Sequence, residues 1–501
     1  MNQTFTSKLR RRLLLLLAGI VPILGLMISC DKDDNLNMQE FDPAKEIEIT
    51  EFYPDSGGIA TPIIIEGSNF GADTTGLRVF FKDSLGVRHQ AGLVGSNGNK
   101  IYAMVPKLTY LKKLNIIVER TDKDAGNYTG TAEDHFIYKT ETTVSTVVGK
   151  PEPDNNSMPT VGGDFSSATL SAPFAIVLDD EDNIFITERS FYTQSGYSGQ
   201  SARNEKGEGV QSNLVIADTK AQTATVMLYG ADFTNAPTFS GEAGNESVYM
   251  PEDAGLYFYQ LPKSLSYAPR RRSLITGPES KDVIEGNWKY SFVSNKEDNM
   301  IYSVMWKGQL VRFNPSTRNV EVLLDKIIPD IPNARGQSGC NTYCIFSPTE
   351  PNMLYFAMEE YNMIGRVDVS KLADKDKATY KGEAYAGRSF IEGPVNGRGW
   401  EDGLLENARF LSPKQICFTT DGKLYIADSG NHCIRVIDTT APKDKATVNT
   451  AIGLPQSPGF RDGGPEIAKF YHPTGVAVNA DGSIVYVADH RNKVIRKLSI
   501  E

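Results

Sequence analysis

The sequence predicts an all-β protein, and three observations support this fold class. A pattern of about sixty residues is written twice near the C-terminus, at 399–428 and again at 459–489. Asp421-Gly422 and Asp481-Gly482, dipeptides that favour tight hairpin turns, stand between short apolar runs. Runs rich in β-branched residues recur from residue 144 onward and mostly end in Gly. Short strands joined by tight turns and repeated at a long period indicate a repeat architecture.

The two copies agree over their whole length. The identical pairs are Gly399 and Gly459, Asp402 and Asp462, Gly403 and Gly463, Ala408 and Ala468, Phe410 and Phe470, Pro413 and Pro473, and Asp428 and Asp489. After the last Asp, each copy continues with Asn, Ile and Arg at the same spacing, ending at Arg435 and at Arg496. This pattern resembles the NHL repeat, whose unit is a four-stranded blade of a β-propeller.

Fainter copies extend the resemblance upstream. Residues 168–173 match 408–413, and Glu188 follows Pro173 at the spacing at which Asp428 follows Pro413. Second strands of further blades are expected at 299–304 and 352–357. Outermost strands are expected at 144–149, 224–230, 272–277, 319–325, 382–387 and 447–453, which predicts a six-bladed propeller over 143–501. The chain after Gly453 supplies only three strands, so we expect 144–149 to complete the last blade and close the ring.

The N-terminus has the pattern of a secretion signal over residues 1–29. Basic residues at 8 and 10–12 precede an apolar run from Leu13 to Ile28. The segment Leu26-Met-Ile-Ser-Cys30 resembles a bacterial lipobox, which implies lipidation of Cys30, although Met27 stands where Leu is more usual. The alternative is an ordinary signal peptide or a single membrane anchor, but the apolar run is short and broken by Pro and Gly.

The residues after Cys30 predict where the protein acts. The acidic tract at 31–34 resembles the surface-export signal of Bacteroidetes lipoproteins, and 30–45 is expected to be an acidic tether. This resemblance implies an outer-membrane lipoprotein facing the cell exterior, with an outer-membrane transporter complex as a candidate partner. The formal charge of −10 becomes −14 once the four basic residues of the leader are lost. No basic stripe is present for nucleic acid.

The remaining four cysteines do not form a metal-binding pattern. Cys340, Cys344, Cys417 and Cys433 contain no CxxC spacing, and buried free thiols are favoured over disulfides, although the sequence leaves both open.

Residues 46–141 predict a separate sandwich domain. Phe52-Tyr-Pro54, Gly58, Gly67, Asn69 and Phe70-Gly71 resemble the IPT/TIG domain, an immunoglobulin-like β-sandwich. We expect Gly67 and Asn69 to serve turn geometry and Phe70 to lie in the core. The domain is expected to act as a spacer, with a partner-docking surface as the alternative.

Ligand contact is expected at one mouth of the propeller, where the loop between second and third strands meets the link to the next blade. The largest insertion follows Glu188 and is polar, Gly-rich and aromatic. Sugar sites combine an aromatic platform with planar hydrogen-bonding groups. The predicted ligand-binding residues are Glu188, Arg189, Tyr192, Tyr197, Arg203, Arg398, Trp400 and Arg461. An inter-blade plug is the alternative role for Trp400, because Phe460 is its repeat equivalent.

A structural role is the favoured interpretation of the carboxylates at the ends of second strands. Resemblance to NHL repeats implies that Asp428 and Asp489 hold the following loop by accepting backbone hydrogen bonds. Glu188 departs from the repeat's Asp and lies beside the insertion, so we expect it to contact a ligand.

Catalytic and metal-binding signatures are weak. No HExxH or phosphate loop occurs, and His432, His472 and His490 all lie in the last two predicted blades, which disfavours a radial metal cage. No cofactor or metal is expected. A calcium site at Asp179–Asp182 is an alternative, although solvated residues of a hairpin turn are the favoured explanation of these acids.

Three functions follow from this layout. Surface lipoproteins of this kind resemble components of carbohydrate-uptake systems, which implies non-catalytic capture of an oligosaccharide or polysaccharide. The alternative is a carbohydrate-active hydrolase or lyase that uses carboxylates at the channel mouth. The third is a protein-interaction scaffold. Because a fold hosts many functions, these hypotheses depend on the site rather than on the architecture.

Overall fold

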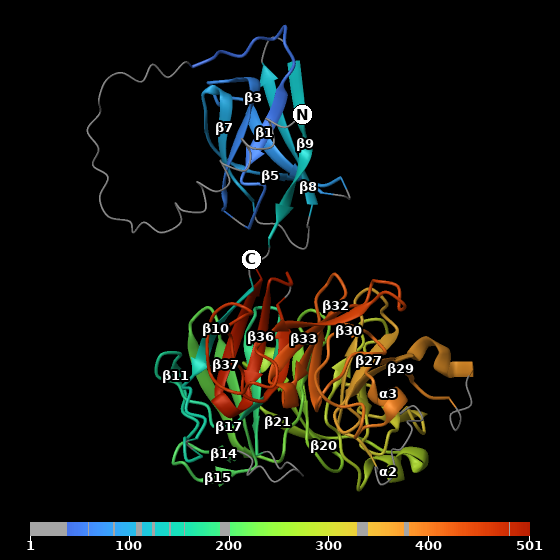
Figure 1. Cartoon of the computed structure of the whole chain (residues 1–501). Coiled ribbons are helices and arrows are strands. Elements are labelled where there is room, and N and C mark those ends of the chain that lie inside the picture. The colour runs from blue at the N-terminus through green and yellow to red at the C-terminus, as the bar shows by residue number, and fades with distance from the viewer. Residues whose placement is uncertain are drawn as a thin grey trace. The chain divides into compact units, whose positions relative to one another are not determined.

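The structure is a computed structural model that describes residues 38–58, 60–83, 86–106, 113–122, 126–139, 142–154, 156–190, 201–327, 339–374, 380–479 and 481–500. The chain divides into two compact units, the first ending at Tyr138 and the second beginning at Lys139 (Figure 1). Within the described residues, no helix is both long and apolar enough to cross a membrane. Cys30, the predicted lipidation site, lies outside these residues.

The first unit consists of two β-sheets. One sheet has the order β1 (Glu48–Tyr53), β3 (Pro62–Gly71), β7 (Gly98–Met104), β6 (Gly92–Ser96). The other has the order β2 (Ser56–Gly57), β9 (Gly126–Tyr138), β8 (Lys113–Asp122), β4 (Leu77–Lys82), β5 (Arg88–Gln90). Strand β4 buries Leu77, Val79 and Phe81 on one face, as the alternation of a half-buried strand requires.

The glycine and asparagine of the predicted turn have different roles. Asn69 has a φ of +63°, and its amide donates to the carbonyls of Asp42 and Lys45 at 3.0 and 2.7 Å. It therefore ties the end of the predicted tether to the sandwich. A Cβ on Gly67 would lie 2.0 Å from the carbonyl oxygen of Glu48, so this position requires glycine for close strand approach rather than for positive φ. Phe70 is buried in the core, as predicted.

Among its described residues, the second unit contains six sheets built on one plan, an antiparallel meander of four strands; β11 and β30 add a short fifth strand to two of them, and β14 and β15 form a separate two-stranded sheet. The first two sheets are β12 (Pro173–Leu178), β13 (Ile184–Arg189), β16 (Ser212–Asp218), β17 (Thr223–Ala231), and β18 (Thr238–Ser240), β19 (Ser247–Pro251), β20 (Tyr257–Pro262), β21 (Arg270–Ser273). The next two are β22 (Val293–Ser294), β23 (Ile301–Val304), β24 (Leu310–Phe313), β25 (Val320–Leu324), and β26 (Thr342–Phe346), β27 (Met353–Met358), β28 (Met363–Asp368), β29 (Glu383–Ala386).

The last two sheets contain the clear sequence repeats. They are β31 (Pro413–Phe418), β32 (Lys423–Asp428), β33 (Cys433–Asp438), β34 (Thr447–Ile452), and β35 (Pro473–Val478), β36 (Ile484–Asp489), β37 (Val494–Ile500), joined by β10 (Thr142–Gly149). Shorter elements are β11 (Gly163–Asp164), β14 (Ala202–Arg203), β15 (Gly209–Val210), β30 (Gly403–Leu404), α2 (Pro278–Ile284) and α3 (Ser389–Glu392), with 3-10 turns η1 (Lys263–Leu265), η2 (Val369–Asp374), η3 (Ser429–Asn431) and η4 (His490–Asn492).

The two ends of this unit meet in one sheet. Strand β10 pairs antiparallel with β37, from Thr142 opposite Ile500 to Gly149 opposite Val494. This is the pairing that the missing fourth strand of the final repeat predicts. Strands β10, β36 and β37 lie together in Figure 1, although β10 is near the start of the unit and the other two are at its end.

The first strands of the six sheets contact one another in chain order. Strand β12 contacts β18, β18 contacts β22, β22 contacts β26, β26 contacts β31, β31 contacts β35, and β35 contacts β12 again. Gln415 on β31 links three of them, since its side chain donates to Ile176 O at 2.6 Å and accepts from the N–H groups of Ile176 and Val476 at 3.0 and 3.2 Å. The second unit is therefore β-propeller-like.

Apolar side chains fill the spaces between sheets. One cluster joins Ile176 and Ile186 of the first sheet to Val148 and Ile495 of the sheet that contains both ends of the unit. Strands β32 and β36 are buried almost throughout. A strand buried on both faces needs a continuous apolar run, which explains why these segments do not alternate in the sequence.

Candidate functional site

The repeated Asp and Arg of the last two sheets form matching buried networks. The carboxylate of Asp428 accepts hydrogen bonds from Leu411 N, Asn431 Nδ2 and Arg435 Nη1 at 2.9, 2.8 and 2.9 Å. Burial outweighs these interactions and raises the pKa of Asp428 to about 6. Asp489 and Arg496 repeat the arrangement at 2.8 Å. These carboxylates hold the loops that surround them, which is the structural role the sequence favoured.

Glu188 occupies the equivalent position in the first sheet and is equally buried, but its side-chain hydrogen-bond partners differ from those of Asp428. Its carboxylate accepts from Ser171 N at 2.6 Å and Asn213 Nδ2 at 2.8 Å, and also from the hydroxyl of Thr160. The residue is fully buried, and burial raises its pKa. Glu188 therefore has no exposed surface for the ligand contact that the sequence predicted, because local donors already occupy its oxygens.

The other predicted residues do not converge on one place. Arg203 donates to Gly207 O at 2.7 Å and also to Asn156 O, so it holds the β14–β15 hairpin. Trp400 is 41% exposed and donates to Thr450 Oγ1 on β34, the last strand of its sheet. Arg398 and Arg461 are exposed in the links that precede β31 and β35. These links run beside the last strand of a sheet before they reach the first, which separates them from Arg189. Tyr192 and Tyr197 lie outside the described residues.

Arg189 is the predicted ligand-binding residue that lies among several other charged and aromatic side chains. It ends β13, its side chain is 11% exposed, and Nη2 donates to Asp253 Oδ2 at 3.0 Å. Nη1 also donates to Asn235 Oδ1. The guanidinium lies over the rings of Phe174 and Tyr290, at 5.3 and 5.4 Å from their centroids. Cation–π contacts of this kind strengthen when they are shielded from water.

Further charged residues surround Arg189. We call Arg189, Asp253, Lys289, Glu359, Glu360 and Lys414 the charged cluster. They lie in the loops between second and third strands or in the links between sheets, or within two residues of them. In an antiparallel meander these loops and links lie at the same end of the sheets. The two loop types that the sequence nominated therefore do build a site, mostly from residues that the sequence did not nominate.

Glu359 and Lys414 connect the fourth sheet to the fifth. Lys414 Nζ lies 2.5 Å from Glu359 Oε1 and 5.8 Å from the centroid of Phe174, the ring that Arg189 also covers. Glu360 accepts from Asn341 N at 2.7 Å. Burial, reinforced by the negative charge of Glu359, raises the pKa of Glu360 to about 7.

Lys289 and Tyr343 complete the buried polar groups. Lys289 Nζ donates to Gly255 O at 2.5 Å, and burial lowers its pKa to about 8. The ring of Tyr343 lies 6.4 Å from that of Tyr290, and its pKa is raised well above the usual value by burial. The Tyr343 hydroxyl is buried and has no hydrogen-bond partner among the described residues. An unpaired buried hydroxyl is costly, which makes it a candidate contact for a ligand or water.

A tryptophan pair lies at the same end of the third sheet. The rings of Trp288 and Trp306 meet edge to face at 4.9 Å, and Trp288 is 40% exposed. Trp288 forms an isolated bridge with Ala254, next to Asp253. Sequence reasoning missed this pair although its signal was present. Trp306 follows the second strand expected at 299–304, and Trp288 stands in the link before that blade.

The histidines lie close together but are not placed to bind a metal. The rings of His432 and His472 are 4.4 Å apart, and His490 Nδ1 lies 2.9 Å from Pro173 O. Burial lowers the pKa of His432 to about 4 and those of His472 and His490 to about 3. Within the described residues, no three His, Cys, Asp or Glu side chains are positioned to hold a metal ion. Asp179 accepts from Glu181 N and Asn183 N, as a turn residue does.

A cavity lies along the first strands of the six sheets, and Tyr343 is among its lining residues. It has a volume of about 540 Å³ and is lined by all six first strands, including Phe239, Phe346 and Phe418. Cys344 and Cys417 line it, and they and the other two described cysteines are buried free thiols. We call it the central cavity.

Comparison with known families confirms both resemblances. The IPT/TIG domain family matches residues 48–138, and the NHL repeat family matches residues 410–437. Protein SUPPRESSOR OF QUENCHING 1, chloroplastic, of Arabidopsis thaliana is 32% identical over 102 residues, which are 20% of this chain and 9% of that protein. NHL repeat-containing protein 2 of Bos taurus is 35% identical over 103 residues, which are 20% of this chain and 13% of that protein. The matches thus span about a tenth of the length of these curated relatives.

Solved structures resemble nearly the whole chain. A protein of unknown function from Bacteroides thetaiotaomicron has a TM-score of 0.61 at 19% identity, covering 92% of this chain and 100% of that one. An auxiliary nutrient binding protein from Bacteroides ovatus has a TM-score of 0.57 at 19% identity, with 92% and 100% covered. Another from Bacteroides thetaiotaomicron has a TM-score of 0.54 at 20% identity, with 92% and 99% covered. Likeness at this identity shows the fold alone.

Proposed function

Because the chain carries an IPT/TIG domain and an NHL repeat, we propose that it is a cell-surface lipoprotein that captures a glycan at the charged cluster without catalysing a reaction. In this proposal the six four-stranded sheets are the blades of a closed propeller. The return of β35 to β12 and the pairing of β10 with β37 support a closed ring. Closure protects the sheet edges that would otherwise invite aggregation.

The observation that carries the proposal is the position of Arg189. A guanidinium held by Asp253 and Asn235 is a planar, preorganised donor, and the rings of Phe174 and Tyr290 fix its plane. The Trp288–Trp306 pair provides the apolar surface against which the C–H face of a sugar packs. The Tyr343 hydroxyl adds a further hydrogen-bonding group. This combination of planar polar groups and aromatic rings fits a carbohydrate better than a nucleic acid or an apolar ligand.

The cellular setting completes the proposal. Cys30 is the lipid attachment site, residues 31–45 are the tether, and the protein faces the exterior of the outer membrane. Two proteins of similar fold are auxiliary nutrient binding proteins of Bacteroides, which supports a role in nutrient uptake beside an outer-membrane transporter. Replacing Cys30 with Ala and following the protein through membrane fractionation and fatty-acid labelling tests this part. Unchanged labelling would contradict it.

The second candidate function is a carbohydrate-active hydrolase or lyase, and one observation favours it. Glu359 is ion-paired with Lys414, whereas the neighbouring Glu360 has a raised pKa. Acid–base cleavage of a glycosidic bond uses one carboxyl group as the acid and a second as the base or nucleophile. Product analysis after incubation with bound glycans separates this candidate from capture alone.

The experiment that tests capture is a glycan screen of the protein purified without residues 1–30. We expect Arg189→Gln to weaken glycan binding at least tenfold, and Trp288→Ala to weaken it several-fold. Arg398→Gln is the matched control, since Arg398 is exposed in a link that lies outside the cluster. Tyr192→Ala, Tyr197→Ala and Trp400→Ala test the residues nominated from sequence alone. Capture of a protein from a secreted extract, with no glycan bound, would favour a scaffold instead.

The proposal fails if no glycan binds. It also fails if Arg189→Gln and Trp288→Ala leave the glycan affinity unchanged while keeping the thermal midpoint of the parent protein. If the protein releases shortened sugars and Glu360→Gln stops this release, the function is hydrolysis or eliminative cleavage rather than capture.

A further inference from the structure

A polar cavity lies between the second and third sheets, apart from both the charged cluster and the central cavity. Its volume is about 800 Å³, within the usual range of small-molecule sites. It is lined by Ser240, Gly241, Glu242, Asn245, Tyr249, Gln260, Arg272, Asp298, Asn299, Asn314, Pro315, Ser316 and Arg318. We call it the side pocket. The hairpins after β18, β22 and β24 contribute to it, and in a meander these turns lie at the opposite end from the loops of the charged cluster.

Strand alternation explains why arginine faces this pocket. Residues 270–272 of β21 are all arginine, and successive side chains point to opposite faces of a sheet. Arg271 forms a two-pronged bond with Glu252, through Nε at 2.6 Å and Nη2 at 2.7 Å. Arg272 therefore points to the other face. Tyr249 and Gln260, which are paired across β19 and β20, share that face with Arg272.

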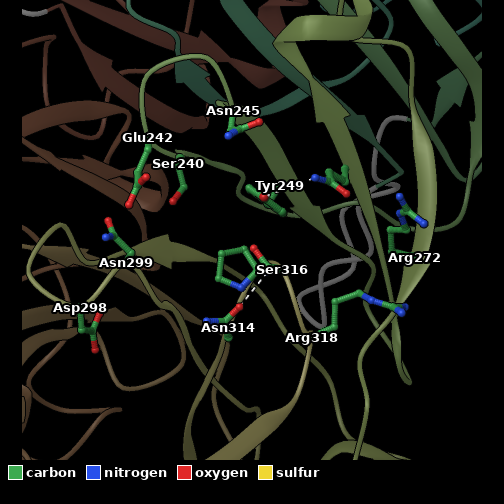
Figure 2. Close-up of a pocket in the computed structure, with 13 residues that line it drawn as sticks. Ser240, Glu242, Asn245, Tyr249, Arg272, Asp298, Asn299, Asn314, Ser316 and Arg318 are labelled. Atoms are coloured by element: carbon green, nitrogen blue, oxygen red, sulfur yellow. Dashed lines mark hydrogen bonds between the residues drawn. The ribbon is translucent and has the colours of Figure 1, made fainter.

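Among the described residues, the two arginines of the pocket form no ion pair with Glu242 or Asp298, the two carboxylates that also line it. Within the part of the chain that the structure describes, Arg272 forms no ion pair, and the guanidinium of Arg318 donates only to the carbonyl of Ser273, at 2.9 Å. Asp298 lines the pocket but is already bonded to Tyr302 Oη at 2.6 Å and Arg312 Nη1 at 3.2 Å. Figure 2 shows Arg272 and Arg318 on one side of the pocket, and Glu242, Asp298 and Asn299 on the other.

Neutral hydrogen-bonding groups lie between these two sides. Figure 2 shows Tyr249, Asn314 and Ser316 in the middle of the pocket, with Ser316 N donating to Asn314 Oδ1 at 2.9 Å. Gln260 Nε2 lies 3.4 Å from Tyr249 Oη. Amides and hydroxyls both donate and accept, which suits a ligand that carries several hydroxyl groups.

We propose that the side pocket binds a sugar residue that carries a carboxylate, such as a hexuronate within an acidic oligosaccharide. Arg272 and Arg318 take the carboxylate, because guanidinium groups match its geometry. The central amides and hydroxyls take the ring hydroxyls. This inference rests on the proposed function, because the ligand is again a glycan. It adds a second binding site and predicts that the glycan bound there is negatively charged. A neutral glycan at the charged cluster and an acidic one at the side pocket are independent.

The test is calorimetric titration of the purified protein with trigalacturonate and with the same trimer after its carboxyl groups are reduced to alcohols. We expect trigalacturonate to bind, the reduced trimer to bind at least tenfold more weakly, and added salt to weaken only the first. Arg272→Gln and Arg318→Gln should each weaken trigalacturonate binding at least fivefold. Arg78→Gln is the control, since Arg78 is exposed on β4 of the first unit and does not line the pocket.

Two further variants separate this proposal from the first. Arg189→Gln should leave trigalacturonate binding unchanged while it reduces the capture of neutral glycans. Asn314→Ala, which keeps both arginines, should weaken trigalacturonate binding about threefold. No binding of trigalacturonate, equal binding of the reduced trimer, or loss only in Arg189→Gln would overturn the side pocket as a uronate site. Neutral-glycan capture is tested separately, by the loss of neutral-glycan binding in Arg189→Gln.

Discussion

Lys414 Nζ lies 2.5 Å from Glu359 Oε1, although the two side chains are only 1% and 12% exposed. Burial lowers the pKa of Lys414, while the charge of Glu359 opposes this effect. The pair joins the fourth sheet to the fifth at the charged cluster. A buried ion pair adds little net stability, but a buried charge without its partner is costly.

Lys414→Met should therefore lower the free energy of unfolding by about 3 kcal/mol, because it leaves Glu359 unpaired. The double variant Lys414→Met/Glu359→Gln should recover at least half of that loss. Urea denaturation measures both. Lys423→Met removes a more exposed partner of Asp421 and is the control, with an expected loss below about 1 kcal/mol. Equal losses in the single and double variants would contradict the pairing.

Arg435→Lys should destabilise the fifth sheet. The Arg435 guanidinium donates to Asp428 at 2.9 Å, Asp402 at 2.6 Å, Arg409 O at 2.9 Å and Glu401 O at 2.8 Å. A lysine ammonium cannot maintain this fork, so we expect a loss of about 2–4 kcal/mol in thermal or urea unfolding.

The repeat supplies an internal check on this prediction. Arg496→Lys should cost a similar amount, since Arg496 repeats the bonds to Asp489 and Asp462. Arg461→Lys, at an exposed link position, should leave the unfolding midpoint unchanged. A neutral Arg435→Lys variant would mean that the network does not stabilise the fold.

Val148→Asp tests the pairing of the two ends of the second unit. Val148 on β10 is fully buried and packs with Ile176, Ile186 and Ile495. A carboxylate there has no partner, so we expect a loss of about 4 kcal/mol and faster proteolysis near β37. Ser145→Asp is the matched control, because Ser145 is exposed on the same strand. Protease resistance equal to that of the parent in Val148→Asp would argue against a closing role for β10.

His432→Asn should flatten the acid sensitivity of the protein. Burial lowers the pKa of His432 from 6.5 to about 4, so the folded state favours the neutral ring. The stability from this group is present above pH 6.5 and is lost as the pH falls toward 4, by up to about 3 kcal/mol. Asn tolerates the left-handed φ of +59° at this position, and its oxygen can accept the His472 N–H bond.

The measurement for His432→Asn is the difference in unfolding free energy between variant and parent at pH 7.5 and at pH 4.5. When the pH is lowered from 7.5 to 4.5, the variant should lose less unfolding free energy than the parent. A difference that is constant across this range would show that His432 titrates equally in the folded and unfolded states.

The sequence predicted the loop types of the site better than its residues. Arg189 lies in the charged cluster because it ends a second strand, and that end of each sheet was nominated in advance. Trp400 and Arg461 were nominated because they lie in links between blades, but those links run beside the outermost strands, β34 and β10, of the sheets that they enter. Glu188 was chosen because it departs from the repeat, yet it is as buried as Asp428, and Thr160 and Asn213 bind its oxygens.

The sequence by itself determined the local structure of the chain, its strands and turns. Hairpin glycines, apolar runs and the Asp–Asn–Arg spacing specify strands and turns through contacts between near neighbours, and the family matches confirm the IPT/TIG domain and the NHL repeat. Only the tertiary structure decided which side chains meet across sheets. Arg189 and Asp253 are 64 residues apart, and Lys414 and Glu359 are 55 apart. Such pairs depend on the packing angle and order of whole sheets, which no local pattern encodes.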